Sequence, residues 1–250
     1  MPNKVVWITG ASSGIGRSVA IEFARRGLSV ALSARGVDGL EQTARECGGN
    51  RAVVVPLDVN DRAANHEAAA RIAGILGGLD IAFLNAGTCE YVDVQRFDAQ
   101  LCERVMRSNF VGIANGIEAA LPYLRKSARP QLVGMSSTVA YGALPRAEAY
   151  GASKAAIRYL MESLRIDLRR EAIAVSVVCP GFVKTPLTAR NDFRMPGLIE
   201  ADKAARIIVD GVIAKRAEIH FPLRFSLPFK IAALLPGPLY SRLAALVTKS

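Results

Sequence analysis

Residues 5–16 read VVWITGASSGIG, and this stretch decides the fold because an apolar run leads directly into three glycines. Residues 17–26 continue with apolar side chains at helical spacing, and Gly27 is placed to end that helix. Glycine loses more conformational entropy on folding than any other residue, so Gly10, Gly14 and Gly16 indicate a special backbone. One such backbone brings N–H groups at a helix N-terminus against a phosphate, and the other is a plain tight turn.

The rest of the chain repeats this order of a short apolar run and a longer helical pattern. We expect strands at 5–8, 28–34, 52–59, 79–87, 130–137 and 173–181, with a short one at 219–222. We expect helices up to 26 and at 38–47, 61–76, 98–124 and 150–170. The alternation predicts an α/β fold, a Rossmann-like doubly wound parallel sheet with helices on both faces. In such a sheet a ligand binds at the carboxyl ends of the strands, near the switch in strand order.

Length and composition predict a single domain over residues 1–250. The 250 residues are 51% hydrophobic and 22% charged, which is typical of a globular chain. No repeat, low-complexity linker or change in composition marks a second domain. Residues 182–200, FVKTPLTARNDFRMPGLIE, are the longest stretch without a regular pattern and are expected to form a substrate loop.

The chain is strongly basic, with a net charge of +10 and a pI of about 9.8. Its arginines are scattered along the predicted helices, and no nucleic-acid-binding motif stands out, so we expect no nucleic-acid partner. The charge instead predicts a basic, soluble surface. The alternative is a positive field that attracts an anionic cofactor or an anionic membrane.

Cysteine and histidine are too scattered to predict a metal site or a disulfide framework. Neither a CxxC pair nor a zinc spacing occurs among Cys47, Cys89, Cys102, Cys179, His66 and His220. We therefore expect reduced thiols in a cytoplasmic protein. The four-residue apolar run after Lys4 is also too short for a signal peptide.

The end of the second predicted strand indicates which nicotinamide cofactor binds. Folds of this class that bind NAD carry an acidic residue there for the ribose 2′-hydroxyl, whereas an arginine accommodates a 2′-phosphate. This chain reads Ser33-Ala34-Arg35-Gly36, and Arg17 after the glycines adds a second positive charge. The pattern favours NADP over NAD, and the alternative is that Arg35 is an ordinary loop arginine.

Small and polar residues mark the ends of the third and fourth predicted strands. Asp58 and Val59 end the third, where a carboxylate can accept a hydrogen bond from an adenine amino group. Asn85, Ala86 and Gly87 end the fourth, where glycine allows the backbone to approach a cofactor closely. Together with the glycine turn between a strand and a helix, they predict a dinucleotide site along this edge of the sheet.

Tyr150 and Lys154 form a candidate acid–base pair. They lie four residues apart at the start of a predicted helix, so they share a face. A tyrosine with a pKa of about 10 is a poor catalyst at neutral pH, but a nearby lysine cation stabilises the phenolate and lowers that pKa. Such a pair can move a proton to or from a carbonyl or alcohol oxygen, which Ser137 is placed to hydrogen-bond. The alternative is a surface tyrosine beside a solvated lysine.

With these motifs in this order, the chain resembles the compact branch of the short-chain dehydrogenase/reductase family. The resemblance covers about residues 4–190. It rests on TGASSGIG at 9–16, the Asp58 position, NAG at 85–87, an asparagine in the long helix, SS at 136–137, YGASK at 150–154 and PGFVKTP at 180–186. One position departs from the family, because its usual pair of asparagines reads Leu84-Asn85 here.

The resemblance implies a role for each of these residues. Tyr150 would be the general acid in reduction and the base in oxidation, and Lys154 would bind the nicotinamide ribose and lower the pKa of Tyr150. Ser137 would orient the substrate carbonyl, and Asn109 would hold a helix kink and a water that relays protons to Lys154. Cofactor contacts would come from Gly10, Ser12, Ser13, Gly14, Ile15, Gly16, Arg35, Asp58, Val59, Asn85, Ala86, Gly87, Tyr150, Lys154, Pro180, Gly181, Val183 and Thr185.

Residues 219–250 form an apolar, basic C-terminal extension. They include four lysines and arginines, many Leu, Phe and Pro, and no Asp or Glu. Their apolar runs are shorter than the roughly 20 residues of a membrane span. Three interpretations stay open: helices packed over the substrate pocket or a subunit interface, a wall for a lipid-like substrate, or a basic amphipathic anchor at 223–250 on the inner surface of a membrane.

The sequence therefore predicts an NADP(H)-dependent oxidoreductase that moves hydride between the nicotinamide and a carbonyl or secondary alcohol carbon of an apolar substrate. One alternative is an NAD-linked dehydrogenase, and another is a catalytically silent NADP-sensing or scaffold protein. The family resemblance further implies a homodimer or homotetramer built on the helices at 98–124 and 150–170.

Overall fold

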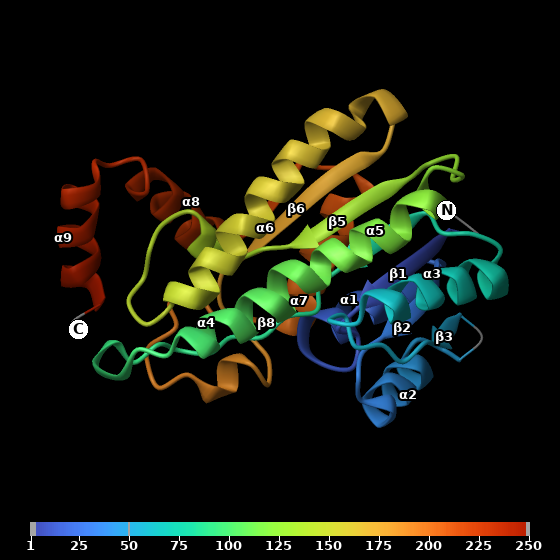
Figure 1. Ribbon diagram of the computed structural model, residues 1–250, viewed down its shortest axis with the longest axis horizontal. Coiled ribbons are helices and arrows are strands. Elements are labelled where there is room, and N and C mark those ends of the chain that lie inside the picture. The colour runs from blue at the N-terminus through green and yellow to red at the C-terminus, as the bar shows by residue number, and fades with distance from the viewer. Residues whose placement is uncertain (1–3, 50, 249–250) are drawn as a thin grey trace.

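The fold is built on a seven-stranded sheet in which every pairing is parallel. The computed structural model describes residues 4–49 and 51–248. The strand order is β3-β2-β1-β4-β5-β6-β9 (Figure 1). The strands are β1 (Val5–Thr9), β2 (Ser29–Ser33), β3 (Ala52–Val54), β4 (Ile81–Leu84), β5 (Gln131–Met135), β6 (Ala174–Pro180) and β9 (Glu218–Phe221). This order confirms the predicted Rossmann-like, doubly wound parallel sheet.

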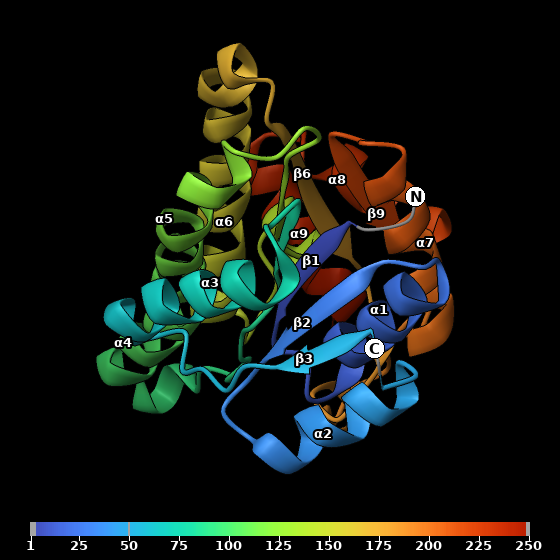
Figure 2. The same ribbon diagram turned by 90° about the vertical axis from the view of Figure 1, so that its right-hand side faces the viewer.

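Helices cover both faces of the sheet, which is why its strands are apolar along their length. Figure 2 shows α3, α4, α5 and α6 on one face, with α1, α2 and α7 on the other. Two cores result, one around Phe23 and Phe83 and the other around Trp7 and Ile113. The seven helices are α1 (Gly14–Arg25), α2 (Val37–Glu46), α3 (Arg62–Leu76), α4 (Ala99–Met106), α5 (Gly112–Leu124), α6 (Glu148–Asp167) and α7 (Ala201–Ile213).

The strand order changes direction between β1 and β4. The chain builds outward from β1 to β3 and then returns, so that β4 pairs with the free side of β1. A crevice forms where the connections at the carboxyl ends diverge, and ligands of doubly wound sheets bind there. The residues that follow β1 and β4, beginning at Gly10 and Asn85, lie at this crevice.

Helices α1 and α7 lie next to each other although 184 residues separate their contacts. Ser18 Oγ is 3.2 Å from Asp202 Oδ1, and Arg26 Nη2 donates to Asp210 Oδ1 at 2.7 Å. Their apolar faces belong to the same buried core, which includes Val19 of α1. The helix that begins in the glycine turn is therefore supported by a distant part of the chain.

The third strand is shorter than expected, and its predicted end at residue 59 is wrong. β3 ends at Val54, two residues before Pro56, which has no N–H to donate to a neighbouring strand. Leu57 N still donates to the Ala34 carbonyl oxygen at 3.0 Å, so the chain continues beside β2. Asp58 consequently lies in the loop after the strand.

The predicted ends of the fourth and fifth strands are also too late in the chain. β4 ends just before Asn85, and β5 ends two residues before Ser137. Asn85 leaves the strand direction because its N–H donates to Thr9 Oγ1 at 3.0 Å, away from the sheet ladder. The polar residues therefore lie in loops at the edge of the sheet.

The long helix expected at 98–124 is divided by a π-helical turn, Arg107–Val111, between α4 and α5. One extra residue per turn widens the helix there, and such turns are frequent at functional sites. Asn109 lies buried within this turn. The helix expected at 150–170 is α6, which begins two residues earlier and ends at Asp167.

The two least regular regions of the sequence contain short elements. Residues 182–200 include a pair of two-residue strands, β7 (Val183–Lys184) and β8 (Ile199–Glu200). The C-terminal extension forms α8 (Leu223–Ala232) and α9 (Gly237–Thr248) beside the amino end of α6 (Figure 1). Within residues 4–49 and 51–248, no helix is both long enough and apolar enough to cross a membrane.

Candidate active site

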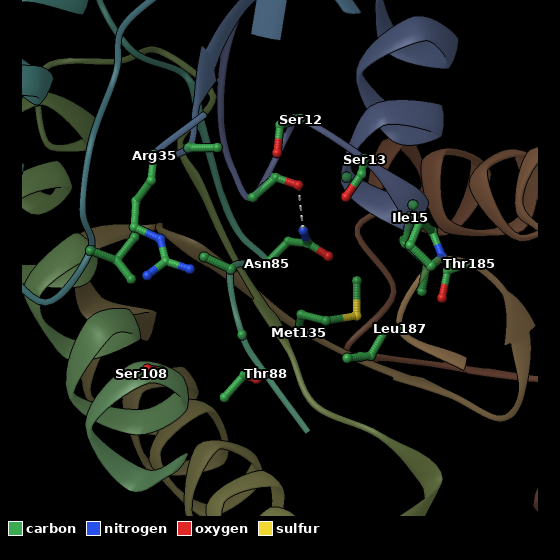
Figure 3. A pocket seen from close by; sticks show the side chains of 18 of the residues that line it. Ser12, Ser13, Ile15, Arg35, Asn85, Thr88, Ser108, Met135, Thr185 and Leu187 are labelled. Carbon is green, nitrogen blue, oxygen red and sulfur yellow. Dashed lines mark hydrogen bonds between the residues drawn. The ribbon is translucent and has the colours of Figure 1, made fainter. Parts of the chain in front are cut away.

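A cavity of about 540 Å3 lies at the carboxyl ends of the strands and brings most of the predicted site residues together (Figure 3). The glycine turn, the loops after β2, β3 and β4, the start of α6 and the loop after β6 all contribute to its walls. The predicted residues that line it are Gly10, Ser12, Ser13, Gly14, Ile15, Gly16, Arg35, Asp58, Val59, Asn85, Ala86, Gly87, Tyr150, Lys154, Pro180 and Thr185.

Two of the three glycines in the turn are required by the packing of the chain on itself. A Cβ on Gly10 would lie 2.8 Å from Asn85 Nδ2, and its φ of +68° is also unfavourable for other residues. A Cβ on Gly16 would overlap the Gly10 carbonyl oxygen. Gly14 differs, because a Cβ there would meet only the Thr185 side chain at 3.3 Å, while its φ of +55° favours glycine. The turn thus joins β1, α1 and the loop after β4 tightly.

The N-terminus of α1 opens into the cavity and suits an anion. The first helical hydrogen bond runs from Arg17 N to the Ser13 carbonyl oxygen, so the N–H groups of residues 14–16 have no partner within the helix. No acidic residue lies in the first turn, and Ser13 forms no side-chain cap. Free N–H groups and the helix dipole together attract a phosphate.

The two arginines expected at the cofactor differ in their surroundings. Arg35 is exposed at the cavity, opposite Ile15 and Thr185 (Figure 3), and makes no ion pair or side-chain hydrogen bond with any described residue. Arg17 donates to the Ser12 carbonyl oxygen at 2.6 Å, lies 4.0 Å from Glu46 and is absent from the cavity wall. Arg35 is therefore the arginine available for a 2′-phosphate, and Arg17 instead supports the glycine turn.

The residues after β3 and β4 form the floor of the site. Asp58 is exposed at the cavity, and its Oδ1 accepts a hydrogen bond from Asn60 N at 2.9 Å. Asn85 is fixed from its side chain, whose Nδ2 donates to the Thr9 carbonyl oxygen at 3.0 Å. Gly87 is needed because a Cβ there would lie 2.8 Å from Asn109 Oδ1 and 3.4 Å from Lys154 Nζ.

Tyr150 and Lys154 lie side by side in the first half of α6. Lys154 Nζ is 5.6 Å from the centre of the Tyr150 ring and donates to the Met135 carbonyl oxygen at 3.0 Å. Lys154 is only 3% exposed, and this burial lowers its pKa to about 8. The lysine is therefore a cation at neutral pH that loses its proton in mildly alkaline solution.

Burial has the largest effect on the pKa of Tyr150, and the lowering of that pKa by Lys154 stays a prediction. Burial raises the pKa of the Tyr150 phenol above its ordinary value, and a hydrogen bond with Ser137 acts in the opposite direction. Ser137 is itself 9% exposed and begins the 3-10 turn Thr138–Ala140. Its side chain lies behind the cavity wall, between the Tyr150 phenol and the Pro180 carbonyl oxygen, which is 3.4 Å from Ser137 Oγ.

Asn109 holds the loop after β4 against α6 from within the π-helical turn. Its Nδ2 donates to the Thr88 carbonyl oxygen at 3.0 Å and to Ser153 Oγ at 2.9 Å, while its Oδ1 accepts from Thr88 N at 2.7 Å. Both amide protons are thus used within the protein. Any proton relay to Lys154 would not use the amide N–H groups of Asn109.

Two predicted cofactor residues do not reach the cavity. Gly181 lies against α8, where a Cβ would meet Phe225 at 3.1 Å. The Val183 side chain is 2% exposed and belongs to the core on the α1–α7 face of the sheet. The family motif predicts both beside the nicotinamide, but in this structure Pro180, Thr185 and Pro186 are the members of that motif that line the cavity.

Several cavity residues were missed by sequence reasoning, among them Thr88, Ser108, Met135, Leu187 and Arg190. Arg190 lies within the expected substrate loop and is the third basic residue of the wall, after Arg35 and Lys154. Its position in the irregular stretch 182–200 was a signal, but nothing in the sequence distinguishes it from the neighbouring Arg194. Met135 and Ser108 reach the cavity only through the strand end and the π-helical turn that carry them.

Aromatic side chains pack beside the Tyr150 end of the cavity. The ring centre of Phe182 is 6.0 Å from that of Phe193 and 5.7 Å from that of Phe225, and Tyr91 and Phe229 extend the group at 5.8 and 5.9 Å. These five residues, here called the aromatic wall, join the loop after β4, the stretch 182–200 and α8. Tyr91 lies close enough to Tyr150 to contribute to its raised pKa. None of the five rings lines the cavity itself, so the wall forms an apolar layer behind this end of the site.

The hydrogen-bond donors of the cavity suit a dinucleotide that carries an additional phosphate. Free N–H groups at the start of α1 suit a pyrophosphate, and unpaired Arg35 suits a further phosphate. The four cysteines of the chain are free, and no group of three His, Cys, Asp or Glu side chains in the described ranges could hold a metal ion. The arrangement can therefore bind a nicotinamide dinucleotide beside a tyrosine that can exchange a proton.

Comparison with known proteins agrees with this description of the cavity. Residues 4–194 match the family model for short chain dehydrogenase. An uncharacterized oxidoreductase of Myxococcus xanthus is 36% identical over 98% of this chain and 97% of its own length, and 11-beta-hydroxysteroid dehydrogenase 1A of Arabidopsis thaliana is 34% identical over 93% and 72%. A short chain dehydrogenase/reductase of Burkholderia phymatum, solved in complex with NAD, has the same fold, with a TM-score of 0.85, 23% identity and coverage of 92% and 93%.

Proposed function

Because the chain belongs to the short-chain dehydrogenase family, we propose that it is an oxidoreductase that uses NADP(H) on the carbonyl or secondary alcohol group of an apolar substrate. The nicotinamide, when bound, supplies or accepts the hydride. The single observation that carries this proposal is the position of Tyr150 and Lys154 on α6. Both line the same cavity as the glycine turn.

Tyr150 is proposed to exchange the proton. In the direction of reduction, its phenol donates a proton to the oxygen of the carbonyl substrate as that oxygen gains negative charge. The raised pKa of Tyr150 keeps the phenol protonated before the reaction. Lys154, a cation below about pH 8, stabilises the phenolate that remains. Ser137 hydrogen-bonds the Tyr150 phenol from behind the cavity wall, and we propose that it orients the reacting group through this phenol.

Arg35 supports NADP(H) rather than NAD(H) as the cofactor. It is exposed at the cavity without a carboxylate partner among the described residues, and no acidic residue follows β2 to accept from a ribose hydroxyl. A guanidinium binds a phosphate dianion through paired, charge-assisted hydrogen bonds. The neighbour solved with NAD shares the fold at low identity, so it does not decide between the two cofactors.

The aromatic wall supports an apolar, lipid-like substrate. None of its five rings lines the cavity, but Tyr91 lies close enough to Tyr150 to raise its pKa, so we propose that a substrate extends from the reacting carbon toward this group. Several relatives are named 11-beta-hydroxysteroid dehydrogenases, and a large apolar alcohol or ketone of that kind suits such a surface. The substrate class therefore includes bulky hydrophobic carbonyl compounds.

Self-association and a cytoplasmic location complete the proposal. Tyr159 and Ile166 of α6 are both 75% exposed, and such apolar side chains on the proposed subunit helices favour a homodimer or homotetramer. Four free cysteines suit a reducing compartment.

The deciding experiment measures oxidation of NADPH, and separately of NADH, against ketones and aldehydes that range from small to lipid-like. We expect turnover with NADPH on the larger apolar compounds, and a loss of at least a hundredfold in Tyr150→Phe, because that variant lacks the proton donor. Turnover with NADH alone would favour the NAD-linked alternative. Tight NADPH binding without any turnover would favour a silent NADP-sensing or scaffold protein.

A further inference from the structure

Helix α8 presents two apolar faces, and only one of them packs against the protein. The inner face carries Phe225 and Phe229, which belong to the aromatic wall. The outer face carries Leu223, Leu227 and Ile231 at four-residue spacing, and Leu234 just after the helix continues the same stripe. These four side chains are between 49% and 83% exposed. A helix that only closed the pocket would need the inner face alone.

The inner face is fixed by polar contacts, so the outer stripe is held away from the protein. Lys230 Nζ donates to Glu218 Oε2 at 2.6 Å, and Glu218 also accepts from the hydroxyl of Tyr141 in the loop after Ser137. Burial alone would raise the pKa of Glu218, but the hydrogen bonds from Lys230 and Tyr141 hold it below its ordinary value. Ser226 adds a contact with His220 Nδ1 at 2.9 Å.

Helix α9 repeats the pattern next to α8. Leu239, Leu243 and Leu246 recur at helical spacing and are between 41% and 72% exposed. Tyr240 faces the protein instead, and its hydroxyl donates to the Ala143 carbonyl oxygen at 2.7 Å. Figure 1 shows α8 and α9 together at one end of the molecule, beside the amino end of α6. The two stripes thus lie on adjacent helices at the end of the molecule that holds the active site.

All the charged side chains around these two stripes are positive. Residues 219–248 contain no carboxylate side chain. Arg224 and Arg242 are exposed and form no ion pair or side-chain hydrogen bond with the rest of the described chain. Lys230, the other cation of α8 and α9, is occupied by Glu218. An occupant of this surface must therefore offer both an apolar phase and negative charge.

We propose that α8 and α9 bind the surface of a lipid bilayer that contains anionic lipids, with the two leucine-rich stripes inserted at the boundary between headgroups and acyl chains. Amphipathic helices with basic flanks bind anionic bilayers in this way. A second copy of the chain fits less well. A twofold contact would bring Arg224 and Arg242 of both copies into one interface, with no carboxylate in the surface to compensate for their charge.

This orientation would place the active site at the membrane. The aromatic wall and the outer stripe are opposite faces of α8, so the apolar end of the site lies one helix away from the proposed lipid contact. This part rests on the proposed function, because it adds a route for a lipid-like substrate. Membrane binding itself does not depend on the proposed function, and it can be measured without substrate turnover.

The test is co-sedimentation of the full chain with vesicles of phosphatidylcholine, with and without about 30% phosphatidylserine. We expect binding to the anionic vesicles that weakens at high salt. Leu227→Gln/Ile231→Gln should lower the partition coefficient at least tenfold, and Arg224→Gln/Arg242→Gln should do so to a similar degree. All four side chains are exposed, and circular dichroism with NADPH binding confirms that each variant is folded.

Matched control variants distinguish binding by this surface from binding by the positive charge of the whole protein. Ile75→Gln removes an exposed apolar residue from α3, and Arg169→Gln/Arg170→Gln removes two exposed charges just after α6, at the opposite end of the molecule (Figure 1). Both controls should bind as the unaltered chain does. The proposal is overturned if the unaltered chain binds neither vesicle, or if the controls lose as much binding as the α8 and α9 variants. A dimer that Leu227→Gln/Ile231→Gln dissociates in light scattering, without vesicle binding, would assign the surface to a second copy.

Discussion

Close approach, more than flexibility, explains why glycine occupies several positions around the active site. At Gly16 a side chain would overlap a backbone oxygen of the preceding turn, and at Gly87 it would press on Asn109 and Lys154. Backbone atoms cannot move aside as the end of a flexible side chain can. The backbone contact therefore requires glycine at position 16, whereas at position 87 a Cβ would displace the ends of the Asn109 and Lys154 side chains.

Gly16→Ala should be among the most destabilising single substitutions in the chain. The new Cβ overlaps the Gly10 carbonyl oxygen, so β1 and α1 must separate, and we expect a loss of about 3 kcal/mol or more in the free energy of unfolding. Urea unfolding followed by circular dichroism measures this loss. Gly74→Ala in α3 is the control, because no atom lies within 4 Å of its added Cβ, and it should leave stability unchanged or raise it by up to about 1 kcal/mol.

Arg35→Ser should raise the KM for NADPH by about ten- to a hundredfold, because a charge-assisted hydrogen bond contributes about 1.5–3 kcal/mol. The KM for NADH should change little, since that cofactor lacks the 2′-phosphate. Arg71→Ser, which removes an exposed arginine from α3, serves as the charge control. Equal increases for both cofactors would show that Arg35 does not read the 2′-phosphate.

The pH dependence of the reaction should report Lys154. Its pKa is lowered to about 8, so its charge is present below that pH and is lost above it, while Tyr150 stays protonated because its pKa is raised. The kcat/KM for carbonyl reduction should therefore fall as pH rises through about 8. In Lys154→Arg the cation persists, and the fall should move up by more than one pH unit. An unchanged profile in that variant would assign the fall to another group.

At the residue scale, the spacing of Tyr150 and Lys154 predicts that they lie together, but not how their surroundings shift their pKa values. The four-residue separation of Tyr150 and Lys154 predicts a shared helical face, and the structure places both at the cavity. The direction of the Tyr150 pKa shift could not be predicted, because it depends on burial by side chains from several elements. Arg190 was missed for the same reason, since an irregular loop gives no periodicity that shows which side chain turns inward.

At the scale of elements, the contact between α8 and the loop after β5 links the C-terminal helices to the active site. Glu218 of β9 holds Lys230 of α8 on one oxygen and Tyr141 on the other. Tyr141 follows directly after the 3-10 turn that Ser137 begins. Glu218 thus connects α8 to the loop that follows Ser137.

Lys230→Met should loosen this contact while keeping the aliphatic part of the side chain. Glu218 is half-buried and would lose its ion pair, so we expect a loss of about 1–2 kcal/mol in the free energy of unfolding. Lys203→Met in α7 is the control, because Lys203 is exposed and forms no ion pair with any described residue. If both variants unfold at the same urea concentration, the contact with Glu218 contributes nothing to stability.

Element type was predictable from periodicity, whereas element ends were not. The strand after residue 52 stops early because Pro56 cannot donate a hydrogen bond, although its apolar pattern continues. The π-helical turn at 107–111 is invisible to a helical pattern, because one extra residue hardly changes the spacing of apolar side chains. The faces of α8 could not be assigned either, since residues 223–234 are apolar on both sides of the helix.

For the whole molecule, the main consequence is that cofactor binding should stabilise the fold. The cavity is formed by loops from both halves of the sheet, so a dinucleotide bound there connects them. At an NADPH concentration about 100 times its Kd, binding adds about 2.7 kcal/mol. For a chain of this size we expect a rise of about 5–10 °C in Tm.

Differential scanning fluorimetry measures this rise, and NADH at the same concentration should give a clearly smaller one. Arg35→Ser should reduce the NADPH rise to that of NADH. Equal rises for both cofactors in the unaltered chain would contradict the proposed selectivity. The measurement requires no substrate, so it separates cofactor binding from catalysis.

The overall architecture was predictable because strand–helix alternation and buried strands admit few solutions. The strand order and the contact between α1 and α7 were not, since neither follows from local pattern. Both depend on which distant segments pack together, and Ser18 and Asp202 carry no signal of their pairing. The cavity could be placed at the correct edge of the sheet, but its walls required these long-range contacts.

The contact between α1 and α7 has a consequence for how the protein is made. During synthesis the glycine turn and α1 emerge early, but the helix that covers Val19 and Phe23 emerges almost two hundred residues later. Until then an apolar surface of the nascent chain stays open to water, and long-range parallel pairing of this kind is slow and prone to aggregation. Ribosome-bound chains of this protein are therefore expected to expose the apolar face of α1 until α7 has left the exit tunnel.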